Sequence, residues 1–175
     1  MADSNQKKSE AKRYLELLRQ GNLAKIEIPS ALMTFGKADY LEARADVEGL
    51  LTDPDPEIRE TALKVLTIYW YLDVYWEKAC AFLEHDPDAN CRAEGAFVLG
   101  VLKRDLGDRE TLFILATVVK NEKEVEYVRE AAYKAMRSIV HFDIMEEKKW
   151  MREGFKFEKD VNRSFIEACL EKGGV

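Results

Sequence analysis

The chain carries the stretch DPDPEIRETALKVL at residues 53–66 and a second version of it, DPDANCRAEGAFVLG, at residues 86–100. A weaker third version, EVEYVREAAYKAM, occupies residues 124–136. Self-similarity at a period of a few tens of residues is typical of a solenoid, in which each unit buries its apolar face only against its neighbours. The first two versions share five residues in register: Asp53/Asp86, Pro54/Pro87, Asp55/Asp88, Arg59/Arg92 and Leu66/Leu99.

Each copy has the chemistry of a turn followed by a helix start. An aspartate caps free backbone amides, and a proline suits the first helical turn. The apolar residues that follow recur at helical spacing, and a second helix is expected after each copy, at about 73–84 and 109–120. The small residues Ala62, Gly95 and Ala132 share one position of the repeat. We therefore expect a neighbouring helix to cross closely at these three residues.

The pattern D-x-D-x-x-(I/V/C)-R-x-x-(A/G) resembles the HEAT repeat, most of all the short bacterial HEAT-like units also seen in phycobilisome lyases. The resemblance covers about residues 38–140. It implies an all-α fold, a right-handed α-α superhelix of three to four helix pairs with atypical terminal caps. HEAT arrays serve as scaffolds, enzyme subunits and nucleic-acid binders, so the resemblance favours a fold much more than a function.

In such repeats the turn aspartates and the following arginine form a polar ladder between adjacent units. The third copy keeps the arginine but has Asn121, Glu122 and Glu124 in place of Asp-Pro-Asp, so its ladder position is the weakest. The resemblance assigns these residues to the ladder: Asp53, Asp55 and Arg59, then Asp86, Asp88 and Arg92, then Arg129.

The ends of the chain depart from the repeat, as expected for a solenoid whose terminal apolar faces must be covered. We expect a disordered tip at 1–9 and one HEAT-like domain over 10–175, with a C-terminal cap at about 141–175. Helices outside the clear repeats are expected at about 10–20, 38–51 and 161–172.

Composition agrees with a helical protein of ordinary domain size, with 47% hydrophobic and 34% charged residues among 175. The sequence has no run of eighteen apolar residues, and its polar start lacks the apolar region of a signal peptide. These features predict a cytoplasmic protein without a membrane partner. Three cysteines, an odd number without a CxxC pair, are expected to be buried thiols.

The net charge of −6 is concentrated in the two best repeats, because residues 53–108 hold six basic and twelve acidic side chains. A nucleic-acid groove would need the opposite sign, which argues against a DNA or RNA partner. Two interpretations of the acidic surplus stay open. The acids serve as helix caps and ladder members, or they form a patch for a basic partner.

No catalytic motif is present, and no cofactor or metal site is expected. His85 and His141 stand far apart and fit neither HExxH nor a zinc spacing, and Gly-rich phosphate loops and GxSxG are missing. Aromatic residues crowd 69–76 and 150–157. Packing in the core and anchoring of a partner both suit such clusters, and for 69–76 we favour packing.

Three classes of function follow. A protein-binding module (an adaptor, a scaffold or an immunity-type inhibitor) comes first, because a solenoid without chemistry offers mainly surface. A subunit of a HEAT-like lyase or another enzyme complex comes second, by resemblance. A DNA-binding protein like the HEAT-like glycosylases comes last, because these need a basic face.

The second helix of each pair lines the concave face in HEAT-like arrays. If Leu50, Leu83 and Val119 point into the core, the opposite face of each second helix is free for a partner protein. It is most acidic at its centre, which favours a partner with a basic segment. The predicted partner-binding row consists of Tyr40, Arg44, Glu48, Asp73, Glu77, Glu84, Arg109, Phe113, Thr117 and Lys120.

Overall fold

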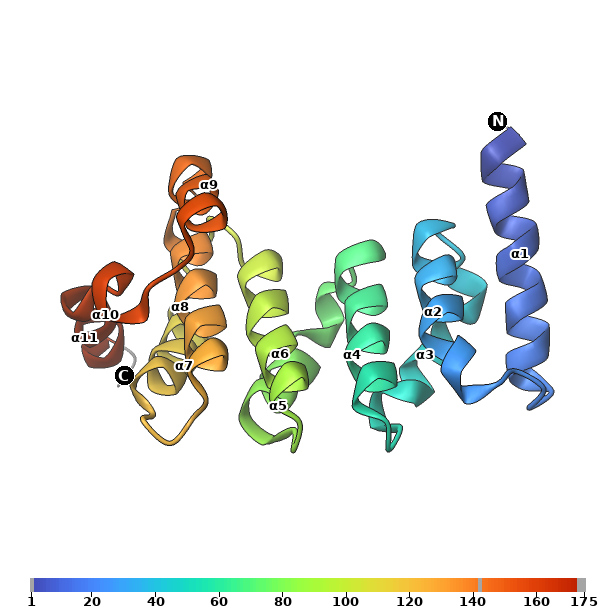
Figure 1. The fold of residues 1–175 in the computed structure, drawn as a ribbon, viewed down its shortest axis with the longest axis horizontal. Helices are drawn as coiled ribbons and strands as arrows, with labels where there is room; N and C mark the ends of the chain where they lie inside the picture. Colours follow the sequence, from blue (N-terminus) through green and yellow to red (C-terminus); the bar gives the residue numbers. More distant parts are fainter. Residues whose placement is uncertain (1, 142, 173–175) are drawn as a thin grey trace. The chain divides into compact units, whose positions relative to one another are not determined.

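The structure of the protein, a computed structural model, describes residues 2–141 and 143–172, and every regular element within them is helical (Figure 1). The all-α class expected from the sequence is therefore confirmed. The chain divides into two compact units, Met1–Tyr75 (unit 1) and Trp76–Val175 (unit 2), and each is described by itself. The unit boundary falls within the helix expected at 73–84, whose first residues, Asp73–Tyr75, form a separate single turn before the α-helix Trp76–His85.

Unit 1 has one long helix, α1, and several shorter elements, and most of its packing is on α2 and α4. Its α-helices are α1 (Ala2–Arg19), α2 (Ile28–Lys37), α3 (Arg44–Gly49) and α4 (Pro56–Lys64). Its single turns are η1 (Lys25–Glu27), η2 (Leu41–Ala43), η3 (Leu50–Thr52), the π-helical η4 (Val65–Tyr69) and η5 (Asp73–Tyr75).

Helix α4 begins as the repeat predicts. The side chain of Asp55 caps it by accepting a hydrogen bond from Glu57 N, and Pro56 occupies the first turn. Ile58 and Ala62 are buried on its apolar face. The local sequence therefore sets both the start of this helix and the side that packs.

Two expectations for unit 1 are wrong in detail. Residues 2–9, expected to be disordered, form the first turns of α1. Gln6, Lys7 and Lys8 in this segment are good helix formers even when exposed. Residue 1 lies outside the described residues. The single helix expected at 38–51 is instead three short pieces, η2, α3 and η3, which end where Thr52 is followed by Asp53 in an extended conformation.

Unit 2 consists of α-helices α5 to α11, and the helix expected at 109–120 is found with these bounds. The helix expected at 161–172 begins two residues later. The elements are α5 (Trp76–His85), α6 (Ala89–Leu102), α7 (Arg109–Lys120), α8 (Glu126–Val140), α9 (Ile144–Glu153), α10 (Phe157–Asp160) and α11 (Arg163–Lys172).

Helix α6 is the centre of unit 2, with α5 on one side and α8 on the other (Figure 1). Helix α7 packs on α8, and α11 covers α7. Leu83 and Val119 are buried, as the row prediction requires, whereas Leu50 in unit 1 is only half-buried. The face of α5 that carries Leu83 and the face of α7 that carries Val119 are therefore buried in the core.

Helix α6 approaches both of its neighbours closely, at two glycines. A Cβ atom on Gly95 would lie 2.7 Å from Leu83 N and 2.8 Å from Ala79 O, both backbone atoms of α5. A Cβ atom on Gly100 would lie 2.8 Å from the Cα of Ala135 in α8. The close crossing expected at Gly95 is thus present, and a second one lies one and a half turns further along α6.

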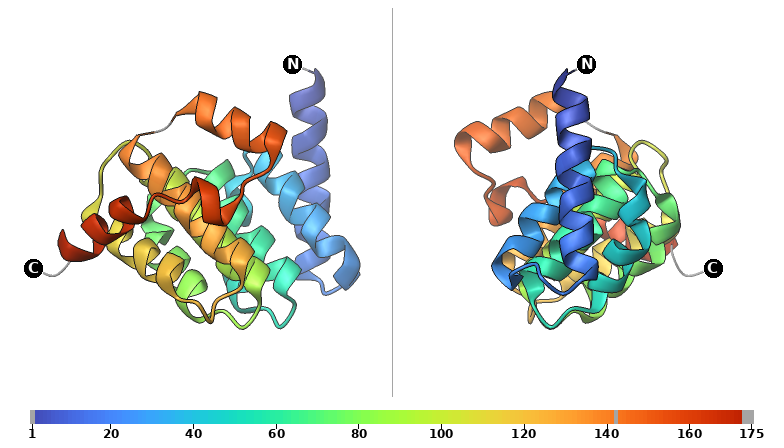
Figure 2. Two further views of the ribbon diagram at one scale, coloured as in Figure 1. Left: turned by 60° about the vertical axis from the view of Figure 1, so that its left-hand side comes forward. Right: turned by 90° about the vertical axis from the view of Figure 1, so that its right-hand side faces the viewer.

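The C-terminal segment packs on the last repeat copy through aromatic rings. Tyr133 of α8 contacts Trp150 and Phe155, with ring centroids 6.4 and 5.9 Å apart. The Tyr133 hydroxyl accepts a hydrogen bond from Asn162 N at 3.0 Å. Helix α9 stands at one end of α8 while α11 lies against α7, so the two cover different parts of the unit (Figure 2).

Replacing Gly95 with alanine tests the close crossing. We expect Gly95→Ala to lower the free energy of unfolding by about 1–3 kcal/mol, because the α5 backbone must move to admit the methyl group. Gly49→Ala is the matched control: nothing lies within 4 Å of its Cβ position, and alanine favours the helical state. Denaturant titrations that show equal stability for the two variants would contradict the crossing.

Candidate functional site

The Asp-rich turn before α4 is held by the arginine six residues later. Asp53 accepts a hydrogen bond from Asp55 N at 2.8 Å, which closes the turn. Nη1 of Arg59 donates to the carbonyl oxygens of Asp53 and Pro54 at 2.8 and 3.1 Å. Arg59 is buried, with 9% of its surface exposed, so the guanidinium satisfies carbonyls that water reaches poorly.

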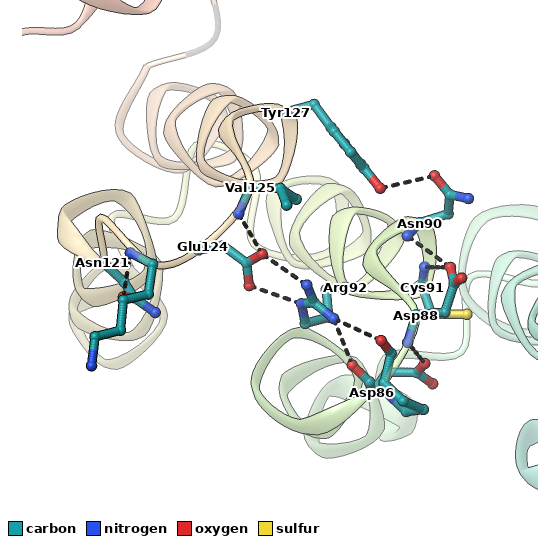
Figure 3. Close-up of polar contacts among 11 residues, drawn as sticks. Asp86, Asp88, Asn90, Cys91, Arg92, Asn121, Glu124, Val125 and Tyr127 are labelled. Carbon is teal, nitrogen blue, oxygen red and sulfur yellow. Dashed lines mark hydrogen bonds and ion pairs between the residues drawn. The ribbon is translucent and has the colours of Figure 1, made fainter.

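The turn before α6 repeats this geometry almost atom for atom (Figure 3). Asp86 accepts from Asp88 N at 2.9 Å, and Asp88 caps α6 through the amides of Asn90 and Cys91. Nη1 of Arg92 donates to the carbonyls of Asp86 and Pro87 at 2.9 and 3.2 Å. The sequence repeat is therefore also a repeat of hydrogen bonds.

Arg92 uses its remaining nitrogens to reach the next turn of unit 2. Nε and Nη2 each donate to a carboxylate oxygen of Glu124 at 2.8 Å, a bidentate pair (Figure 3). Glu124 also accepts from Val125 N, just before α8. One guanidinium thus joins the turn before α6 to the turn before α8.

The electrostatics of this pair follow from its burial and geometry. The hydrogen bond from Arg92 holds the pKa of Glu124 below its ordinary value of 4.5, and that bond outweighs the opposing effect of burial. The same hydrogen bond raises the pKa of Arg92. Side-chain exposures of 18% for Arg92 and 11% for Glu124 limit screening by water.

The third ladder position differs from the first two. Arg129 donates through Nε to the carbonyl of Val119 at 2.9 Å, at the end of α7, and its guanidinium lies 4.3 Å from the ring centre of Phe157. The turn before α8 lacks the Asp-Pro-Asp sequence, and the carbonyl that Arg129 binds belongs to the end of the preceding helix. Arg129 therefore joins α7 and the C-terminal segment to α8.

The predicted row of partner-binding residues falls into both units. In unit 1, Arg44 and Glu48 are tied together by Tyr75: Nε of Arg44 donates to the Tyr75 hydroxyl, which donates to Glu48, both at 3.1 Å. Tyr40 is half-buried beside Phe35, and Asp73 is exposed. These unit 1 members are accordingly only partly free of structural duty.

In unit 2 the row is more open. Glu77 and Glu84 are exposed on α5, and on α7 the members Arg109, Phe113, Thr117 and Lys120 are exposed. Thr117 donates to the Phe113 carbonyl at 3.0 Å within the helix. Lys120 pairs with Glu167 of α11 at 2.7 Å. The row members of unit 2 therefore lie on the exposed surface of α5 and α7.

The aromatic cluster at 69–76 serves mainly in packing, as favoured from the sequence. Trp70 and Tyr75 are buried, and Tyr69 approaches Gly36 of α2. Tyr71 is the exception, with 74% of its surface exposed and a positive φ of 51°. In unit 2, Trp76 donates through Nε1 to the Thr111 hydroxyl at 3.0 Å and so links α5 to α7.

Cys80 of α5 is a buried thiol and lacks the lowered pKa of a nucleophilic cysteine. Burial, helped by the charges of Glu84 and Glu110, raises the pKa of Cys80 to about 12, so its thiol stays protonated and inert at neutral pH. Cys91 is also buried. In the described part of the chain, no three His, Cys, Asp or Glu side chains gather as metal ligands, and no helix is long and apolar enough to cross a membrane.

Sequence reasoning missed two features of unit 2. Glu124 was not expected to be the partner of Arg92, because its turn lacks the aspartate pattern; its position thirty-two residues after Arg92, close to the repeat period, was the available signal. A pocket beside α9 was also missed, since that helix lies outside the repeats. Comparison with known proteins adds no relative: no protein-family model and no curated protein matches the chain.

The ladder arginines are expected to be structural. Arg92→Ala strands the carboxylate of Glu124 and two turn carbonyls, so it should lower the free energy of unfolding by about 1–3 kcal/mol, and Arg59→Ala should have a similar effect. Arg163→Ala is the control, because its ion pair with Glu158 is fully solvated and contributes little. An unchanged melting temperature for Arg92→Ala would contradict the structural role of Arg92.

The lowered pKa of Glu124 predicts a pH dependence of stability. Its contribution is complete above the ordinary pKa of 4.5 and is lost as the pH falls through the lower folded value, because protonation breaks the ion pair. The stability difference between the wild type and Glu124→Gln should therefore shrink as the pH falls from about 6 to about 3. A difference that stays constant over this range would contradict the ion pair.

Proposed function

We propose that the chain is a non-catalytic protein-binding module whose partner contacts the exposed surface of α5 and α7. The observation that supports this most is the division of labour on these two helices. Their inward faces are buried, while Glu77, Glu84 and Phe113 are exposed to solvent. Side chains at such positions can contact a partner without a cost to the packing of the fold.

The charges of this surface favour a partner with a basic segment. Glu77 and Glu84 lie two turns apart on α5, and their exposure leaves them available to a cation. Phe113, with 38% of its surface exposed, offers an apolar anchor on α7. Acidic side chains steer a basic partner by long-range attraction, and the ring contributes contact area once it has docked.

We further propose that the helices of the chain belong to a right-handed HEAT-like superhelix, located in the cytoplasm. The matching hydrogen bonds of Arg59 and Arg92 support a true structural repeat. In such a superhelix Tyr40, Arg44, Glu48 and Asp73 stay predicted members of the partner-binding row. An adaptor, a scaffold and an immunity-type inhibitor all use such a surface.

Charge reversal on α5 tests the proposal. Glu77→Lys with Glu84→Lys should leave the melting temperature nearly unchanged, because exposed charges contribute little to stability. The same double variant should slow association with the partner and weaken its dependence on salt. Affinity capture from the source cells with quantitative mass spectrometry, followed by binding kinetics on the captured protein, provides both measurements.

The matched control is Glu10→Lys with Glu16→Lys, which makes the same charge change on exposed positions of α1. A partner retained by this control and lost by the α5 variant supports the site. Equal binding by the wild type and both variants would place the partner elsewhere on the chain.

A further inference from the structure

A pocket of about 340 Å³ lies among α6, α8 and α9 of unit 2, away from the proposed partner surface of α5 and α7. Small-molecule sites in proteins have volumes of about 300–1,000 Å³ and are mostly apolar. The pocket therefore has the size of a small-ligand site.

Small residues on two packed helices provide the space. Gly100 of α6 and Ala131 and Ala135 of α8 all line the pocket, and α6 and α8 meet closely where Gly100 faces Ala135. Helix α9 contributes Trp150 and Met151 from a third side. The short side chains of α6 and α8 leave space between these two helices and α9, and this space is the pocket.

Large apolar side chains surround this space while remaining accessible. Phe97 is 50% exposed, Tyr127 46% and Met151 81%. All three line the pocket. Exposing large apolar side chains to water is unfavourable, and polar residues could occupy these positions instead. Three such side chains around one pocket therefore indicate a binding surface.

The charged groups of the lining largely neutralise one another. Lys134 pairs with Glu130, and Arg137 pairs with Glu146 at 3.2 Å. Asp143 accepts the amides at the start of α9. The remaining charged or titratable lining residues carry both signs: Arg104, His141 and Glu147. The pocket lining therefore has no large excess of opposite charge that would attract a strongly charged ligand.

The repeat itself marks Phe97 as a departure. The first copy carries a solvent-facing pair, Glu60 with Lys64 at 3.3 Å, and the third copy carries the equivalent Glu130–Lys134 pair. At the same two positions the middle copy has Ala93 and Phe97. Of the three copies, only the middle one has a small residue and an exposed aromatic ring in place of the ion pair.

We propose that this pocket binds a small, uncharged and mainly apolar molecule, aromatic or branched aliphatic, which packs against Phe97, Trp150 and Met151. Contact with these side chains supplies the binding energy, and the internally paired charges at the rim exclude ions. The site is independent of the partner surface on α5 and α7.

Titration with N-phenyl-1-naphthylamine, a neutral apolar dye whose emission rises in apolar surroundings, tests the site in the full chain. We expect saturable binding with one dye per chain. Phe97→Lys, which restores the residue type of the other two copies, should weaken binding at least about tenfold because it places a charge in the apolar contact. The double variant Ala93→Glu with Phe97→Lys rebuilds the Glu–Lys pair of the other two copies. It should keep the melting temperature of the wild type, so that its loss of dye binding cannot be attributed to unfolding.

Phe113→Lys is the matched control, since it removes an exposed phenylalanine from α7, and it should leave dye binding unchanged. It also separates the two proposals, because it alters the partner surface only. Binding that is not saturable, or that Phe97→Lys leaves intact, would overturn the proposal. So would a concentration-dependent dimer, seen by sedimentation and abolished by Phe97→Lys, because a second copy would then be the occupant.

Discussion

The structure of unit 2 depends on one guanidinium that serves two turns at once. Arg92 binds the carbonyls of the Asp-rich turn before α6 and the carboxylate of Glu124 before α8. The hydrogen bonds to Glu124 and to the Asp86 carbonyl are partly buried, so these groups would be costly to leave without a partner. Because one turn precedes α6 and the other precedes α8, the same contact ties the starts of these two helices together.

The contact between Arg92 and Glu124 lies at the helix starts, so it does not use the remaining faces of the helices. The core contacts of α6 are made by small residues such as Gly95 and Gly100, which let neighbouring backbones approach closely. The outward faces of α5 and α7 then carry charges and an exposed ring without a packing role. Gly100 also lines the pocket beside α9, together with Ala131 and Ala135 of α8. Unit 2 thus presents two chemically different surfaces, one charged and one apolar.

Much of this could be predicted from the sequence because it is local or periodic. The helix caps Asp55 and Asp88 and the close crossing at Gly95 all follow from residue type and spacing. The break in the helix expected at 38–51 did not follow, since its pieces are held by tertiary contacts such as that of Arg44 with Tyr75. The pocket did not follow either, because α9 shares no period with the helices that it faces.

The Arg92–Glu124 contact is the central claim about the scaffold, and a double-mutant cycle tests it most directly. Free energies of unfolding would be measured for the wild type, Arg92→Ala, Glu124→Ala and the double variant. A pair that acts as one unit should show a coupling energy of about 1–3 kcal/mol, so the double variant should lose little more than either single one. Losses that simply add would contradict the claim that this guanidinium joins the two turns.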